Sequence, residues 1–282
     1  MLGDAIHAES YRLSRNRGLL FWSVLFVPLA SLVLTVIGVV VAKANEARLA
    51  ASDIDFNIPG GPLDLFQTIS DSAAGFANPA VLMFMTVGAA TLYAGDYRWE
   101  TWRLISARNT RPNLVVAKLA VFAGLMLAAS LAVLVGDLIA ALIQASVFAR
   151  PLGFGVDGEG MGRMGLLALL SWTRILQFTM VGLLTAIVTR SLLAALFVPL
   201  VVGVAQALAP QLMMGFGIAP TEWAPILISP ALATDVVQGV LKNRPDLPDQ
   251  AVLKGVVSLA LWTLVPLAAA LAAFQRQDLS KE

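Results

Sequence analysis

Two ionisable side chains, Asp137 and Arg174, lie inside long apolar runs of this sequence. A charge at the centre of a bilayer costs about 2.5–3.5 kcal/mol on insertion scales, so each side chain is expected to face a partner or water. Both residues are expected nearer the outer than the inner leaflet, so an ion pair between them is geometrically possible. Three interpretations stay open: a static pair, side chains that reach the headgroups, and residues that line a substrate path.

Residue types that carry enzymatic chemistry are scarce. The chain has no cysteine and one histidine, His7, which excludes thiol catalysis and cysteine-ligated metals and makes His7 a solvated or interfacial residue. Gly136-Asp137 is similar to the Gly-Asp pair of membrane aspartyl proteases. That chemistry needs two carboxylates that share a proton, and Asp137 is the only acid in an apolar run. We expect no catalytic residue and no metal site.

Nucleotide-binding motifs give no better candidate. The Walker pattern G-x-x-x-x-G-K-[ST] is absent from the sequence. The stretch Gly153 to Gly158 satisfies G-x-G-x-x-G, but it follows an expected helix and opens no βαβ unit. The chain is therefore expected to hold no cofactor of its own.

The composition is that of a polytopic membrane protein. Of the 282 residues, 58% are hydrophobic and 13% are charged, and the mean hydropathy is +0.80, whereas soluble domains average about 25% charged residues. The net charge of +1 predicts no nucleic-acid partner.

A bilayer core of about 30 Å needs roughly 20 helical residues. Six apolar runs meet this length or come close to it, so we predict an all-α fold with six transmembrane helices. The predicted spans are 19–42, 79–94, 114–148, 165–189, 192–212 and 253–274. The second span is short and is expected to begin near Phe76, and the third is long enough to tilt, project or break. The first run exceeds the apolar core of a cleaved signal, so we favour a retained span.

Charge asymmetry predicts the orientation. With the N-terminus inside, the cytoplasmic segments hold 11 basic and 6 acidic residues, and the outer segments hold 7 basic and 11 acidic residues. Because positive residues resist translocation, both termini are expected in the cytoplasm.

The chain divides accordingly into an interfacial segment at 1–18, a transmembrane domain at 19–275 and a cytoplasmic tail at 276–282. The loop at 95–113 is expected in the cytoplasm, and the loops at 43–78, 149–164 and 213–252 are expected outside. The first outer loop either caps the outer mouth or merely connects two spans. The region 213–252 is expected to form a re-entrant or interfacial hairpin.

Small residues recur every fourth position along the third span, which predicts a close helix contact within the subunit or in a dimer. They are Ala120, Gly124, Ala128, Ala132, Gly136 and Ala140.

The segment from Gly95 to Lys118 is the largest cytoplasmic loop and is rich in arginine and tryptophan. These residue types suit the headgroup boundary, where a ring is half-buried and a guanidinium reaches phosphate. An interfacial loop that obeys the positive-inside rule is one interpretation.

The other interpretation comes from a resemblance. The segment resembles the first cytoplasmic loop of ABC transporter permeases of the type-2 exporter class, with an acid, a threonine, a leucine, an arginine and an Ala-Lys pair at matching places. These are Asp96, Thr101, Leu104, Arg111, Ala117 and Lys118. Glu100 stands where the family usually has glycine. Arg276 and Asp278 are similar to the Arg-Asp pair that closes the last helix in that family.

The resemblance implies a six-span subunit of the bacterial cytoplasmic (inner) membrane, with an N-terminal interfacial helix and a coupling helix between spans two and three. Two copies of a separate ABC ATPase subunit would bind ATP and magnesium, beside a second permease copy or a similar chain. The implied coupling contacts are Trp99, Glu100, Thr101, Trp102 and Arg103. The implied activity is export of an apolar or amphipathic substrate, such as a peptide antibiotic, a drug or a lipid-like molecule. The alternative is a non-transporting subunit that passes ATP-driven motion to an outer partner protein.

Overall fold

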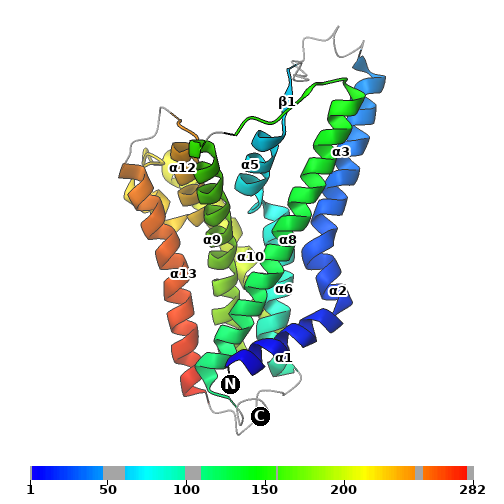
Figure 1. Ribbon diagram of the computed structural model, residues 1–282. Coiled ribbons are helices and arrows are strands. Elements are labelled where there is room, and N and C mark those ends of the chain that lie inside the picture. The colour runs from blue at the N-terminus through cyan, green and yellow to red at the C-terminus, as the bar shows by residue number, and fades with distance from the viewer. Residues whose placement is uncertain (1, 47–60, 99–108, 157, 245–249, 278–282) are drawn as a thin grey trace.

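The computed structural model describes residues 2–46, 61–98, 109–156, 158–244 and 250–277, and nearly all of these residues are helical (Figure 1). The helices in chain order are α1 (Leu2–Arg15), α2 (Arg17–Leu20), α3 (Phe26–Ala44), α5 (Leu65–Gly75), α6 (Pro79–Arg98), α8 (Arg111–Val147), α9 (Gly158–Thr189), α10 (Leu192–Gly215), α11 (Trp223–Ile228), α12 (Pro230–Leu241) and α13 (Gln250–Arg276). A π-helical turn, η1 (Phe21–Leu25), joins α2 to α3.

Five helices of the described chain are long and apolar enough to cross a membrane: Arg17–Ala44, α8, α9, α10 and α13. This agrees with an all-α, multi-pass membrane protein. The predicted second span, 79–94, lies within the single helix α6, which is not among these five helices. It passes the same test only as the pair α5 and α6, which are bent by 54° at a short break.

Two predicted boundaries change, whereas the third span keeps its predicted extent within three residues. The helix α8 runs without a break over 37 residues, about 55 Å at 1.5 Å per residue, so it exceeds the bilayer core rather than dividing. The helix α9 begins at Gly158, several residues inside the expected outer loop. The expected outer loop 43–78 contains α5, which packs against α8 and α9.

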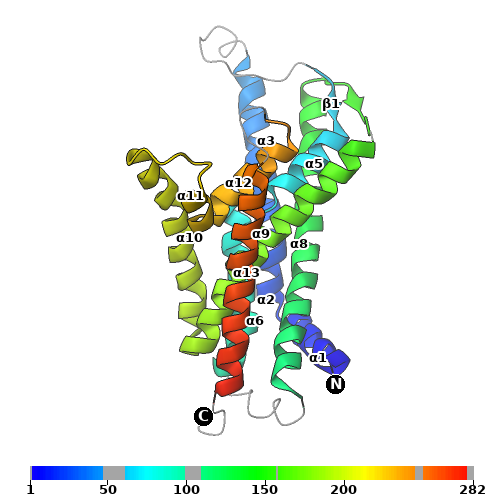
Figure 2. The same cartoon turned by 90° about the vertical axis from the view of Figure 1, so that its left-hand side faces the viewer.

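Segments that were expected on the same side of the membrane lie at the same end of the bundle. The helix α1 runs across the base, beside the end of α6 and the start of α8 (Figure 1). The strand β1 (Leu63–Asp64) and the helices α11 and α12 lie at the opposite end (Figure 2). There β1 pairs in parallel with β2 (Leu152–Gly153) and joins the first two expected outer loops.

The centre of the bundle is α9, which packs against α5, α6, α10, α12 and α13. Large side chains that are almost fully buried, such as Phe122, Ile175, Met180 and Leu183, fill the main core between these helices and α8. By contrast, α3 and α10 present exposed apolar faces, as expected for helices that contact lipid.

The expected hairpin before the last span is present as α11 and α12, held closely on α13. Trp262 Nε1 donates to the Leu227 carbonyl at 2.8 Å. A Cβ atom added at Gly255 would lie 2.5 Å from Val237 Cγ2 and 3.0 Å from the Ala233 carbonyl oxygen. The contact between α12 and α13 therefore requires glycine at position 255.

We expect Gly255→Ala to destabilise the protein by about 1–3 kcal/mol, because overpacking at the Ala233 backbone forces α12 to move. In the matched control, Gly38→Ala, the added Cβ meets nothing within 4 Å, and helix propensity favours alanine over glycine by up to about 1 kcal/mol. Thermal unfolding of both variants in the same detergent measures the difference. Equal unfolding midpoints for the two variants would show that α12 and α13 pack less closely at Gly255 than these distances indicate.

Candidate functional site

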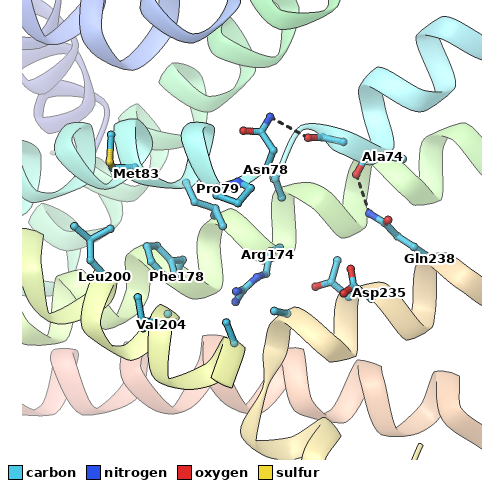
Figure 3. Close-up of a pocket in the computed structure, with 17 residues that line it drawn as sticks. Ala74, Asn78, Pro79, Met83, Arg174, Phe178, Leu200, Val204, Asp235 and Gln238 are labelled. Carbon is cyan, nitrogen blue, oxygen red and sulfur yellow. Dashed lines mark hydrogen bonds between the residues drawn. The ribbon is translucent and has the colours of Figure 1, made fainter. Parts of the chain in front are cut away.

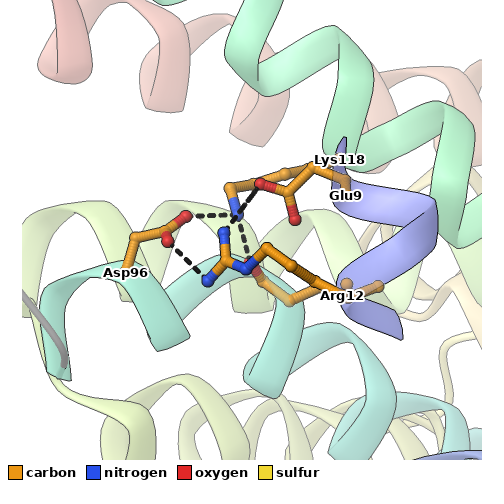
Figure 4. A network of polar contacts seen from close by, with 5 residues as sticks. Glu9, Arg12, Asp96 and Lys118 are labelled. Carbon is orange, nitrogen blue, oxygen red and sulfur yellow. Dashed lines mark hydrogen bonds and ion pairs between the residues drawn. The ribbon is translucent and has the colours of Figure 1, made fainter. Parts of the chain in front are cut away.

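Four charged side chains from three helices form one charge cluster at the end of the bundle where α1 lies (Figure 4). On α8, Lys118 Nζ lies 2.5 Å from Asp96 Oδ2 of α6 and 3.1 Å from Glu9 Oε1 of α1. Arg12 Nη2 lies 2.8 Å from Asp96 Oδ1, and Arg12 Nη1 lies 3.1 Å from Glu9 Oε1. Within the described part of the chain, the charge cluster therefore pairs two cations with two anions.

Three of the four side chains are shielded from solvent, whereas Arg12, at the edge of the charge cluster, is 43% exposed. The Asp96 side chain is 0% exposed and the Lys118 side chain is 2% exposed, and Lys118 Nζ also donates to the Leu92 carbonyl at 2.8 Å. Burial opposes the charge of Arg12, but the carboxylates of Asp96 and Glu9 outweigh it and raise the pKa of this guanidinium above its ordinary value. Buried charges of this kind persist only where each has partners.

The sequence of α1 explains how it reaches the charge cluster. Glu9 and Arg12 are three residues apart, so they lie on one face of the helix. The helix ends before Asn16, whose Oδ1 accepts a hydrogen bond from the Leu19 backbone N–H at 3.1 Å and begins α2. This turn lets α1 lie across the base and pack against α8 while the following helix enters the bundle.

A second group of hydrogen bonds joins the same helix ends to α9 and α13. Arg111 Nη1 donates to the Phe274 carbonyl at 2.8 Å. Tyr97 Oη donates to Gln277 Oε1 at 2.8 Å, and Gln277 Nε2 donates to the Ile187 carbonyl at 2.5 Å. The end of α6 and the start of α8 are thus fixed to α1, α9 and α13 together.

These two helix ends flank the segment in which the coupling contacts were predicted. Asp96 lies in the last turn of α6 and Lys118 in the early turns of α8. The predicted contacts themselves, Trp99, Glu100, Thr101, Trp102 and Arg103, lie outside the described residues.

The ion pair that was considered between Asp137 and Arg174 does not form, because the two side chains line different cavities. Asp137 borders a cavity of about 370 Å³ with Pro28 of α3 and Asp71 of α5. The Arg174 guanidinium instead donates to Gln177, one turn along the same helix, and lies over the ring of Phe178.

Arg174 lines the larger cavity, of about 520 Å³, between α5, α6, α9, α10 and α12 (Figure 3). Its walls are mostly apolar, and its polar groups are few. They come from Asn78, Arg174, Thr234, Asp235 and Gln238. A concave apolar site with a small number of polar groups is the usual form of a small-molecule site.

The break between α5 and α6 forms one wall of this cavity. Asn78 Oδ1 accepts from the Val81 N–H at 3.0 Å, and Pro79 begins α6, a combination typical of a helix start. The last carbonyls of α5 are also satisfied: Ser171 Oγ and Gln238 Nε2 each lie 2.8–2.9 Å from the Ala74 carbonyl oxygen. Broken helices at membrane depth occur where protein or a cavity surrounds the break.

The small-residue stripe of α8 divides into two parts. A Cβ atom at Gly136 would lie 3.2 Å from Pro28 Cβ, so this end packs within the subunit against α3, and Ala132 and Ala140 are half-buried. The other end, with Ala120, Gly124 and Ala128, is exposed on the surface of the bundle. Only this end is free to contact a second chain.

No protein-family model, curated protein or solved structure matches this chain. Among the described residues, no group of three or more acidic or histidine side chains could hold a metal ion.

Sequence reasoning identified Asp96 and Lys118 as motif positions but missed Glu9, Arg12 and Asp235. The i, i+3 spacing of Glu9 and Arg12 on an amphipathic helix was a usable signal, although it is also typical of a solvated helix face. Asp235 carried no local signal, because it follows Arg174 by some 60 positions in a different part of the chain.

We expect Lys118→Met to destabilise the protein by about 3–5 kcal/mol, because removal of one partner leaves a buried charge uncompensated. The matched control is Lys242→Met. Lys242 pairs with Asp71 at 3.3 Å, but the two side chains are 40% and 54% exposed, and exposed pairs contribute about 0–1 kcal/mol. Detergent thermal unfolding of both variants tests this. Similar losses in the two would show that the charge cluster is solvated.

Proposed function

We propose that this chain is the membrane subunit of an ATP-driven ABC exporter in a bacterial cytoplasmic membrane, and that residues 99–103 receive the motion of a separate ATPase subunit. The complex contains two copies of that ATPase, which bind ATP and magnesium, and a second copy of this chain or a similar one. The substrate is an apolar or amphipathic molecule.

One observation carries the proposal. The residues on both sides of the 99–108 segment, Asp96 and Lys118, belong to a single buried charge cluster that also contains α1. A push on this segment would therefore move α1, α6 and α8 as one unit. An ordinary interfacial loop does not require its flanking helices to be fixed to each other, whereas an element that transmits motion does.

The pairing of tryptophan and arginine in the segment supports the same proposal. Trp102 and Arg103 are of the residue types that dominate the energetics of protein interfaces. We assign Trp102 to a groove on the ATPase subunit and Arg103 to an acidic rim of that groove.

One observation favours the alternative function, transmission of motion to an outer partner protein without transport. The helix α8, at about 55 Å, is longer than the bilayer core of about 30 Å, and β1 and β2 tie the loops at its far end together. Transport of a solute by the reconstituted complex decides between the two functions, because the alternative predicts ATP hydrolysis with no solute movement.

We expect Trp102→Ala with Arg103→Glu to weaken the ATPase contact by at least about 2 kcal/mol, roughly 30-fold in Kd, because interface tryptophan and arginine are typical hot spots. The chain should still reach the membrane and unfold at its normal temperature, because this variant leaves Glu9, Arg12, Asp96 and Lys118 unchanged. The measurement is co-purification in mild detergent, with mass spectrometry of the eluate and an ATPase assay.

The matched control is Tyr11→Ala with Arg15→Glu on α1. This is also an aromatic-arginine pair at the same end of the bundle, with Arg15 Cζ 5.1 Å from the Tyr11 ring centre and Tyr11 56% exposed. It should leave the complex intact. Loss of the ATPase in this control, with retention in the Trp102 and Arg103 variant, would place the contact on α1 and contradict the assignment.

A further inference from the structure

The larger cavity has an apolar rim where its lining reaches the exposed surface of α6 and α10. The parts of its rim that belong to α6 and α10 are exposed apolar side chains: Met83 is 42% exposed and Val204 is 60% exposed. Arg174, in contrast, is only 5% exposed and lies inside. A molecule that enters from the bilayer would therefore meet apolar walls first and a buried cation next.

The side chains that line the cavity change from apolar to charged along its length. Figure 3 shows Arg174 between an apolar group, formed by Met83, Leu200 and Val204, and a polar pair, formed by Asp235 and Gln238. The apolar group lies on α6 and α10, and the polar pair lies on α12, at the end of the bundle that carries the expected outer loops. The sequence of environments is thus apolar, then cationic, then anionic.

The two charges of the cavity are available to a ligand. Arg174 and Asp235 point into the same cavity, but no ion pair joins these two described residues (Figure 3). The guanidinium has the Gln177 side chain as its hydrogen-bond partner, which leaves most of its five N–H donors unused. Arginine with free donors is well suited to bind phosphate.

The order of environments matches the order of groups in a zwitterionic phospholipid. Such a molecule carries an acyl chain, then a phosphate, then an ammonium. We propose that this cavity binds a zwitterionic amphiphile of the phosphatidylethanolamine type, with its acyl chain between α6 and α10, its phosphate on Arg174 and its ammonium facing Asp235.

The binding site itself does not depend on an ATPase partner. Only the further role of this amphiphile class as the exported substrate rests on the proposed function. Binding by the purified chain without any ATPase would support the site even if the coupling proposal failed.

The test titrates three lipids into the detergent-purified full chain: phosphatidylethanolamine, phosphatidylglycerol and diacylglycerol. Native mass spectrometry measures the lipid-bound fraction. We expect phosphatidylethanolamine to bind best, phosphatidylglycerol more weakly because it lacks the ammonium, and diacylglycerol least because it lacks the phosphate.

Three variants separate the contributions of the cation, the anion and the rim of the cavity to lipid binding. Arg174→Gln should weaken binding of both phospholipids at least tenfold. Asp235→Asn should reduce the preference for phosphatidylethanolamine over phosphatidylglycerol at least tenfold while phosphatidylglycerol still binds. Ala207→Phe, at an exposed position on the rim, should block both lipids without changing either charge, so the site can be tested even if Arg174→Gln fails to fold.

The matched control is Asp137→Asn, because Asp137 lines the other cavity. It should bind all three lipids as the unmodified chain does. Equal binding of the three lipids, or binding that none of the three variants changes, would mean that the lipids only coat the apolar surface and would overturn the proposal.

Discussion

The mutual neutralisation of Glu9, Arg12, Asp96 and Lys118 is the interaction on which the rest of the structure depends. Lys118 and Asp96 are buried in a largely apolar bundle, and each would be strongly destabilising there alone. Lys118 and Asp96 pair with each other, and α1 supplies a second partner for each, which it can do because the chain turns at Asn16 and lets α1 lie across the base. The helix ends around residues 99–108 are held as a consequence.

A second constraint lies toward the other end of the bundle, where α5 and α6 break at Asn78. Side chains from α9 and α12 satisfy the exposed carbonyls of α5, so these helices must approach the break. Their approach encloses the cavity and brings Arg174 and Asp235 to it from distant parts of the chain. The two proposed functions thus belong to different parts of the molecule: the end that carries the charge cluster receives motion, and the cavity toward the other end binds an amphiphile.

Apolar length alone predicted an all-α fold with six spans, and five of these are helices long and apolar enough to cross a membrane, because a bilayer imposes nearly the same length on every span. It did not predict α5, whose Gln67, Ser70 and Asp71 are typical of a loop and whose helix forms through packing against α8 and α9. Local pattern placed Arg174 within a predicted span and offered Asp137 as one possible partner, but it did not point to Asp235. The side chain that it faces is set by how α12 folds back on α13, a tertiary contact that spacing along the sequence does not encode.

The most direct test of the central claim is native mass spectrometry of the complex extracted in mild detergent from cells that produce the tagged chain at its natural level. We predict an assembly that contains two ATP-binding subunits and two membrane subunits, and that hydrolyses ATP. Extraction under conditions that preserve other membrane complexes, but that yields only this chain and no ATP hydrolysis, would contradict it. The segment 99–108 would then be an interfacial loop between two well-anchored helices.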